Sequence, residues 1–118
     1  MKIFLRTILI LLAITGCSKD FFSGTRNSLI TGCIWKTDHC INTVDNSYVT
    51  VNQCSYHFNT DGTYSIESDD GTSGQGYWEF LQDEEYLRIS NNIYRIRTIS
   101  EKTLILIYGE LEFVFIPL

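Results

Sequence analysis

Cysteine and histidine are the residues of this 118-residue chain whose chemistry is most specific. The two histidines are His39 and His57, and the cysteines stand at positions 17, 33, 40 and 54. His39-Cys40 and Cys54-x-x-His57 would together supply two thiolates and two imidazoles, a tetrahedral zinc set. Adjacent ligands converge poorly on one ion. If the chain is exported, as its N-terminus indicates, its thiols would be oxidised to a disulfide rather than bind zinc. A disulfide is therefore the better prediction, and we expect no metal site.

The N-terminus determines the compartment. A short basic stretch, Met1 to Arg6, precedes an apolar run over 7–14 that is too short to span a bilayer. The segment Ile14-Thr15-Gly16-Cys17 that follows resembles the lipobox of bacterial lipoproteins. That resemblance implies a signal peptide over 1–16, cleavage before Cys17, and acyl chains on the Cys17 thiol.

Lipid on Cys17 would make the membrane a partner of the chain. Stable anchoring takes more than one acyl chain, each buried methylene contributing about 0.8 kcal/mol. Residue 18 is Ser rather than Asp, so the inner-membrane retention signal known in some Gram-negative bacteria is missing. We therefore expect a lipid-anchored protein of the cell envelope, at the outer membrane.

Three cysteines remain in the mature chain besides Cys17, so one disulfide and one free thiol are expected. Three pairings are possible. We favour Cys40 with Cys54, because these two bracket a polar segment over 41–48 that is typical of a long loop. Closing such a loop contributes roughly 3 kcal/mol in the chain-entropy model. Cys33 would then be a small core residue.

Charge limits the choice of partner. Cleavage before Cys17 removes Lys2 and Arg6, which leaves seven basic and 14 acidic side chains and a formal net charge of −7. A charge of this sign argues against nucleic acid as a partner. The remaining length, about 100 residues, is that of one domain.

Short runs rich in aromatic and β-branched residues recur from Leu29 onward, after a polar segment over 17–28 that is typical of a flexible tether. We predict eight strands, at 29–38, 53–60, 62–68, 75–82, 85–90, 92–99, 103–108 and 111–117. Short turn segments separate most of them, which favours an antiparallel meander. Eight such strands can close on themselves and so remove exposed edges.

Alternation assigns the two faces of these strands. Large apolar side chains recur at every second position, and charged ones such as Glu79 and Arg88 lie between them. The apolar set therefore faces the interior. The side chains that would line any ligand cavity there are Trp35, Tyr56, Trp78 and Phe115. A barrel of this size is just wide enough for its own side chains or for one small ligand.

The pattern over 29–118 resembles the lipocalin-like domains of small bacterial lipoproteins. The resemblance depends on Gly32-Cys33-Ile34-Trp35 in the first strand, on Phe58-Asn-Thr-Asp-Gly-Thr-Tyr64 in a hairpin, and on Leu104-Ile-Leu106 in a late strand. It implies an all-β, up-and-down, eight-stranded barrel that holds a ligand or contacts a protein. It supplies no catalytic residues.

The polar motifs do not assemble into a catalytic site. The Asp61-Gly62 segment has the rhythm of a calcium loop, but its ends lack carboxylates and a β-turn explains it. Asp69 and Asp70 are neighbours in a polar loop, whereas acid–base catalysis needs two groups in unlike environments. No base can be assigned to Ser73. We predict neither an enzyme nor a cofactor.

A second resemblance concerns Ser73-Gly74-Gln75-Gly76-Tyr77, which matches the Ser-Gly-x-x-Tyr motif of periplasmic lysozyme inhibitors. It implies an inhibitory loop over 69–77, with Ser73 and Tyr77 as its motif residues, that enters a lysozyme cleft, where Ser73 would hydrogen-bond to a catalytic carboxylate.

The sequence thus gives two functional hypotheses. The first is a monomeric, non-enzymatic binding module whose open end, framed by loops over 39–52 and 69–75, contacts a small apolar ligand or an envelope protein. The alternative is a lysozyme-inhibitor-like or immunity lipoprotein that uses the 69–77 loop.

Overall fold

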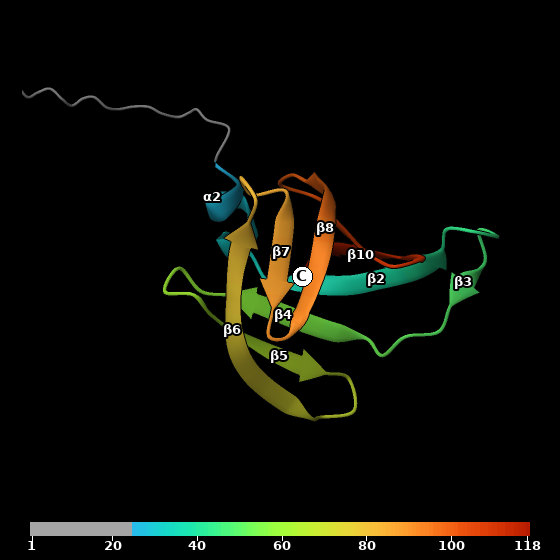
Figure 1. The fold of residues 1–118 in the computed structure, drawn as a ribbon. Coiled ribbons are helices and arrows are strands. Elements are labelled where there is room, and N and C mark those ends of the chain that lie inside the picture. The colour runs from blue at the N-terminus through green and yellow to red at the C-terminus, as the bar shows by residue number, and fades with distance from the viewer. Residues whose placement is uncertain (1–24) are drawn as a thin grey trace, which may run out of the picture.

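The computed structural model describes residues 25–118, which form one antiparallel sheet and one short helix (Figure 1). In chain order, the elements are α2 (Arg26–Thr31), β2 (Trp35–Asn42), β3 (Tyr48–Val49), β4 (Cys54–Phe58), β5 (Thr63–Ser68), β6 (Ser73–Leu81), β7 (Tyr86–Ile89), β8 (Asn92–Ile99), β9 (Leu104–Tyr108) and β10 (Leu111–Pro117). The helix in residues 25–118 is neither long nor apolar enough to cross a membrane.

The sheet closes into a barrel. Its strand order is β10-β9-β8-β7-β6-β5-β4-β2-β3, and β10 also pairs with β2. Eight strands therefore form the ring, while β3 adds two residues to one edge of β2. The predicted eight-stranded antiparallel meander is confirmed.

The interior holds the apolar side chains that the alternation assigned to it. Trp35, Leu87, Leu104 and Leu106 are all at most 1 % exposed, and Phe58 joins them. Burying a side chain of this size stabilises a fold by roughly 1.5–3 kcal/mol relative to leaving it in water. The barrel is held together by this packed interior and by the hydrogen bonds that join its eight strands into a ring.

The first predicted strand is wrong in its N-terminal half. Residues 26–31, which include the end of the expected tether, form helix α2. Thr25 caps this helix, because its side-chain oxygen accepts a hydrogen bond from the Ser28 backbone N–H at 3.1 Å. Ile30 is completely buried, and its carbonyl accepts a hydrogen bond from Trp35 Nε1 at 3.0 Å. The helix thus closes one end of the barrel.

The predicted disulfide between Cys40 and Cys54 is also wrong, since all three cysteines in the described residues are free. Strand β2 continues to Asn42, so Cys40 lies inside a strand and is completely buried. The Thr37 hydroxyl donates a hydrogen bond to the carbonyl of Cys54, which places Cys54 three positions along β2 from Cys40. Three strand residues span about 10 Å, beyond the Cα separation that a disulfide bridges.

Cys33 is not the fully buried core residue that was expected. It lies just after α2, is half-buried, and packs against the core from the closed end of the barrel. Burial raises the pKa of its thiol above the ordinary value.

Candidate functional site

The two tryptophans expected to line a cavity are structural residues. Trp78 is 6 % exposed, and its Nε1–H donates to the Asn59 carbonyl oxygen at 2.9 Å. Trp35, bonded to helix α2, is fully buried. Both side chains therefore use their polar atom and their apolar surface within the fold.

Tyr56 and Phe115, the other two expected ligand residues, do line a cavity. Their rings pack edge to face with centroids 5.6 Å apart at the open end of the barrel, opposite α2. We call this space the mouth cavity; its walls are Thr37, Val51, Asn52, Cys54, Tyr56, Ile89, Tyr94, Leu106, Phe113 and Phe115. Its volume is about 70 Å³, which is room for roughly two water molecules, whereas ligand pockets usually measure about 300–1,000 Å³.

The mouth cavity is lined by phenols that stay neutral. Burial raises the pKa of Tyr56 above its ordinary range, and the neighbouring Tyr94, Cys54 and Tyr64 add to the effect. Burial likewise raises the pKa of Tyr94. The two side chains therefore present uncharged hydroxyl groups at the open end.

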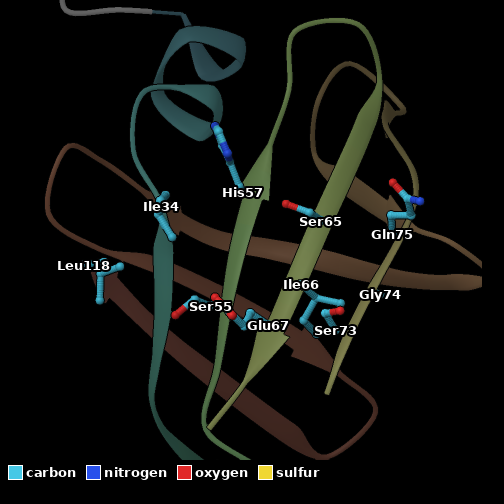
Figure 2. A pocket seen from close by; sticks show the side chains of 10 residues that line it. All are labelled: Ile34, Ser55, His57, Ser65, Ile66, Glu67, Ser73, Gly74, Gln75 and Leu118. Carbon is cyan, nitrogen blue, oxygen red and sulfur yellow. The ribbon is translucent and has the colours of Figure 1, made fainter. Parts of the chain in front are cut away.

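A larger hollow lies on the outside of the barrel, across β4, β5 and β6 (Figure 2). Its volume is about 540 Å³. We call it the outer groove; its walls are Ile34, Ser55, His57, Ser65, Ile66, Glu67, Ser73, Gly74, Gln75 and Leu118.

Strand register explains why polar side chains gather in the outer groove. His57 pairs with Ser65 across β4 and β5, and Ser65 in turn pairs with Gln75 of β6. Two residues further along each strand, Ser55 of β4 pairs with Glu67 of β5. Because alternate residues of a strand point to the same face, these side chains form one polar patch on the outer surface.

The groove changes character at its far end. Ile34 and Leu118, which precede β2 and follow β10, lie beside each other because the Leu118 N–H donates to the Ile34 carbonyl at 2.8 Å. Both are exposed apolar side chains. The outer groove thus joins an apolar end to a polar floor. A nucleophilic serine would need a hydrogen bond to a base such as His57, and residues 25–118 contain no hydrogen bond between His57 and a serine.

Sequence reasoning did not find the outer groove. Ser55, His57 and Glu67 alternate with interior residues such as Tyr56, but the hollow also depends on how the sheet bends and on how the C-terminus meets Ile34. Neither leaves a local signal in the sequence.

The 69–77 segment is not the loop that was expected. Only residues 69–72 turn, and Ser73 to Tyr77 belong to β6, where they pair with β5. Ser73 and Tyr77 lie on the same outer face, and Tyr77 is 75 % exposed. The two residues of the inhibitor-like motif are therefore presented on a strand.

The two predicted loops meet at the open end. Val51 and Asn52 line the mouth cavity, and the Asp69 N–H donates to the Gln53 carbonyl at 3.0 Å. Both loops are shorter than expected, because residues 39–42 belong to strand β2 and residues 73–75 belong to strand β6.

The acidic turn motifs serve the hairpins. Hydrogen bonds from the Thr63 side chain and backbone hold the pKa of Asp61 below its usual value, and those from the Thr72 backbone and side chain do the same for Asp70. In residues 25–118, no cluster of three or more His, Cys, Asp or Glu side chains could hold a metal ion.

Comparison with known proteins supports the fold. No protein-family model matches the chain, and no curated protein matches its sequence. Among solved structures, it is similar to a lipocalin-like protein from Bacteroides uniformis, with a TM-score of 0.58 and 14 % sequence identity. The match covers 75 % of this chain and 99 % of that one. The chain therefore has a lipocalin-like fold.

Proposed function

We propose that this protein is a lipid-anchored, non-enzymatic binding module of the cell envelope that contacts a partner protein through the outer groove. The observation that carries this proposal is the contrast between a packed interior, with about 70 Å³ left at its mouth, and an outer groove of about 540 Å³. A small apolar cargo needs an enclosed pocket several times larger than the mouth cavity.

The chemistry of the outer groove suits a protein surface. It offers hydroxyl, imidazole, amide and carboxylate groups beside the exposed apolar pair Ile34 and Leu118. Protein interfaces combine an apolar contact with a polar rim in this way. The anchor in the proposal depends on Cys17 and the lipobox, which lie outside the described residues.

Site-specific photocrosslinking tests this function. A photoreactive amino acid at Ser65, on the exposed floor of the groove, is expected to give a discrete heavier adduct in cells of the source organism. The same residue placed at Arg95, which is exposed on β8, is the matched control and should give none. Equal adducts at both positions, or none at either, would contradict the proposal.

A small apolar ligand at the mouth is the second candidate, because Tyr56, Phe113 and Phe115 present apolar rings there. Native mass spectrometry of the mature chain carrying Cys17→Ser distinguishes the two candidates. A mass equal to that of the denatured chain is expected if the interior is filled. A retained lipid-sized mass would favour the ligand carrier.

Lysozyme inhibition remains a third candidate, because Ser73 and the exposed Tyr77 share one face of β6. An acidic domain would also be steered towards a basic enzyme. The test is inhibition of purified lysozymes by the wild-type chain and by Ser73→Ala. Inhibition that Ser73→Ala abolishes would establish this candidate.

A further inference from the structure

Within residues 25–118, strand β6 has an unpaired backbone edge. It pairs with β5 from Ser73 to Tyr77, but its ladder with β7 begins only at Trp78. The β7–β8 turn at Ser90 and Asn91 ends β7 at this level, and β6 continues past it (Figure 1). We call the exposed side of Ser73–Gly76 the free edge.

The direction of the backbone groups on the free edge follows from three hydrogen bonds. The Thr72 carbonyl accepts from Ser68, and the Trp78 N–H donates to Gly62, so even-numbered residues of β6 bond to the β5 side. The Tyr77 carbonyl accepts from Ser90 on the opposite side. Because backbone groups alternate along an antiparallel strand, the N–H and C=O of Ser73 and Gln75 point outward from the free edge.

The free edge is open to an approaching chain. Ser73, Gly74 and Gln75 are three consecutive exposed residues in a strand, and Gly74 carries no side chain. Two hollows adjoin this part of β6: the outer groove is lined by Ser73 to Gln75, and another of about 610 Å³ is lined further along by Gly76, Tyr77, Ser90 and Asn91. An added strand would meet bare backbone with space for its side chains.

The surroundings of the free edge are acidic. No lysine or arginine occurs between Lys36 and Arg88, and Arg88, which lines the second hollow, forms an ion pair with Glu79. Glu67 stands opposite Ser73 on β5, and Asp69 and Asp70 form the adjoining turn. Two copies of this edge would repel each other, whereas a strand with lysine or arginine side chains would be attracted.

We propose that the free edge binds an extended, basic segment of the partner protein by strand addition, with Ser73 and Gln75 supplying the backbone hydrogen bonds. This inference rests on the proposed function, because it names the way in which that partner is held. The exposed edge of a β-sheet is a ready template for such pairing.

Amide hydrogen exchange measured by NMR tests the proposal. In the isotope-labelled mature chain carrying Cys17→Ser, the Ser73 and Gln75 amides should exchange freely and the Gly76 amide slowly. The probe is a blocked octapeptide of alternating lysine and threonine. At saturation it should slow exchange at Ser73 and Gln75 about tenfold or more, as ordered strand amides are protected.

Two control peptides separate strand pairing from simple charge attraction. The same peptide with every backbone nitrogen methylated keeps its charge but cannot donate hydrogen bonds, and glutamate in place of lysine reverses its charge. Neither should protect the two amides. Equal protection by either peptide, protection by none of the three, or concentration-dependent protection without peptide would overturn the proposal, the last because it would indicate a second copy.

Variants of the chain complete the design. Gln75→Pro removes an outward N–H without touching the β5 ladder, and Gln75→Ala, which keeps it, is the matched control. The pair Glu67→Lys and Asp69→Lys should weaken peptide binding about tenfold relative to Glu101→Lys and Glu110→Lys, which change the net charge equally. If Gln75→Pro proves unfolded by circular dichroism, this charge comparison decides.

The cellular crosslink distinguishes a failure of strand addition at the free edge from a failure of the proposed function of the outer groove. A Ser65 adduct that persists in folded Gln75→Pro would contradict strand addition but keep the outer groove as a protein contact. A wild-type chain without that adduct would contradict the proposed function itself.

Discussion

The Tyr64 and Ser90 hydroxyls lie 2.7 Å apart and hydrogen-bond across the bare backbone of Gly76. A Cβ atom at Gly76 would approach Ser90 Oγ to 2.6 Å and Tyr64 Cε1 to 2.9 Å. This contact holds the β7–β8 turn against β6 at the level where the free edge begins. It can exist only if residue 76 has no side chain.

Gly76→Ala should therefore destabilise the barrel by about 1–3 kcal/mol, because one methyl group must displace both hydroxyl-bearing side chains. The measurement is urea-induced unfolding. Gly74→Ala is the matched control, since its Cβ would meet only Ile66 Cγ2, at 3.4 Å, and its effect should be much smaller. Equal losses in the two variants would contradict this account of Gly76.

Helix α2 should contribute to stability mainly through Ile30. Ile30→Ala removes a completely buried side chain, and a cost of about 2–5 kcal/mol is expected. The exposed Asn27 of the same helix, changed to Ala, should change the free energy of unfolding by less than about 0.5 kcal/mol. An Ile30→Ala variant as stable as the wild type would show that the helix does not close the barrel in solution.

Three free thiols are expected in the chain carrying Cys17→Ser. Cys40 should react slowest with a thiol reagent, because it is completely buried and burial raises its pKa. After unfolding without reductant, all three cysteines should react. A count of one reactive thiol would restore the disulfide that the sequence suggested.

Alkaline pH should destabilise the fold through Tyr56. Its pKa is raised in the folded state, so the phenol stays protonated there while the unfolded chain loses the proton near the ordinary value of about 10. The contribution is fully present below that pH and is lost as the pH rises above it. Unfolding free energies measured from pH 8 to 11 should fall less steeply in Tyr56→Phe than in the wild type. Parallel curves would remove Tyr56 as the cause.

Lipidation is checked on the full chain. With an intact Cys17, the protein should incorporate radiolabelled palmitate and sediment with membranes. Cys17→Ser should do neither, and Cys33→Ser should behave as the wild type. Palmitate incorporation into Cys17→Ser would contradict the lipobox interpretation.

Period-two patterns were sufficient to predict most of the barrel. Pairs such as Trp78 with Glu79 and Leu87 with Arg88 put an apolar and a charged residue on opposite faces, and the structure has them so. A charged residue in the sequence did not always indicate an exposed position, however. Glu112 is 9 % exposed, because Arg97 reaches across β9 to pair with it from an irregularity in β8.

Local departures from this regular strand pattern could not be predicted from the sequence. The pairing of β2 with β10 shifts register near Asp38, which places Cys40 rather than His39 on the inner face. Leu29 and Ile30 have the composition of a strand, but their place in α2 is fixed by the Thr25 cap and by the tertiary contact with Trp35. The free edge depends on where β7 ends relative to β6, which no single segment encodes.

Helix α2 also gives the barrel a polarity. The chain enters at the closed end, where Arg26 donates a hydrogen bond to the Glu84 carbonyl in the β6–β7 turn, and the turn over 69–72 lies at the other end of β6. If Cys17 carries the lipid, the eight residues to Thr25 reach at most about 28 Å. The closed end would then face the bilayer, and the mouth and the free edge would point away from it, into the aqueous space.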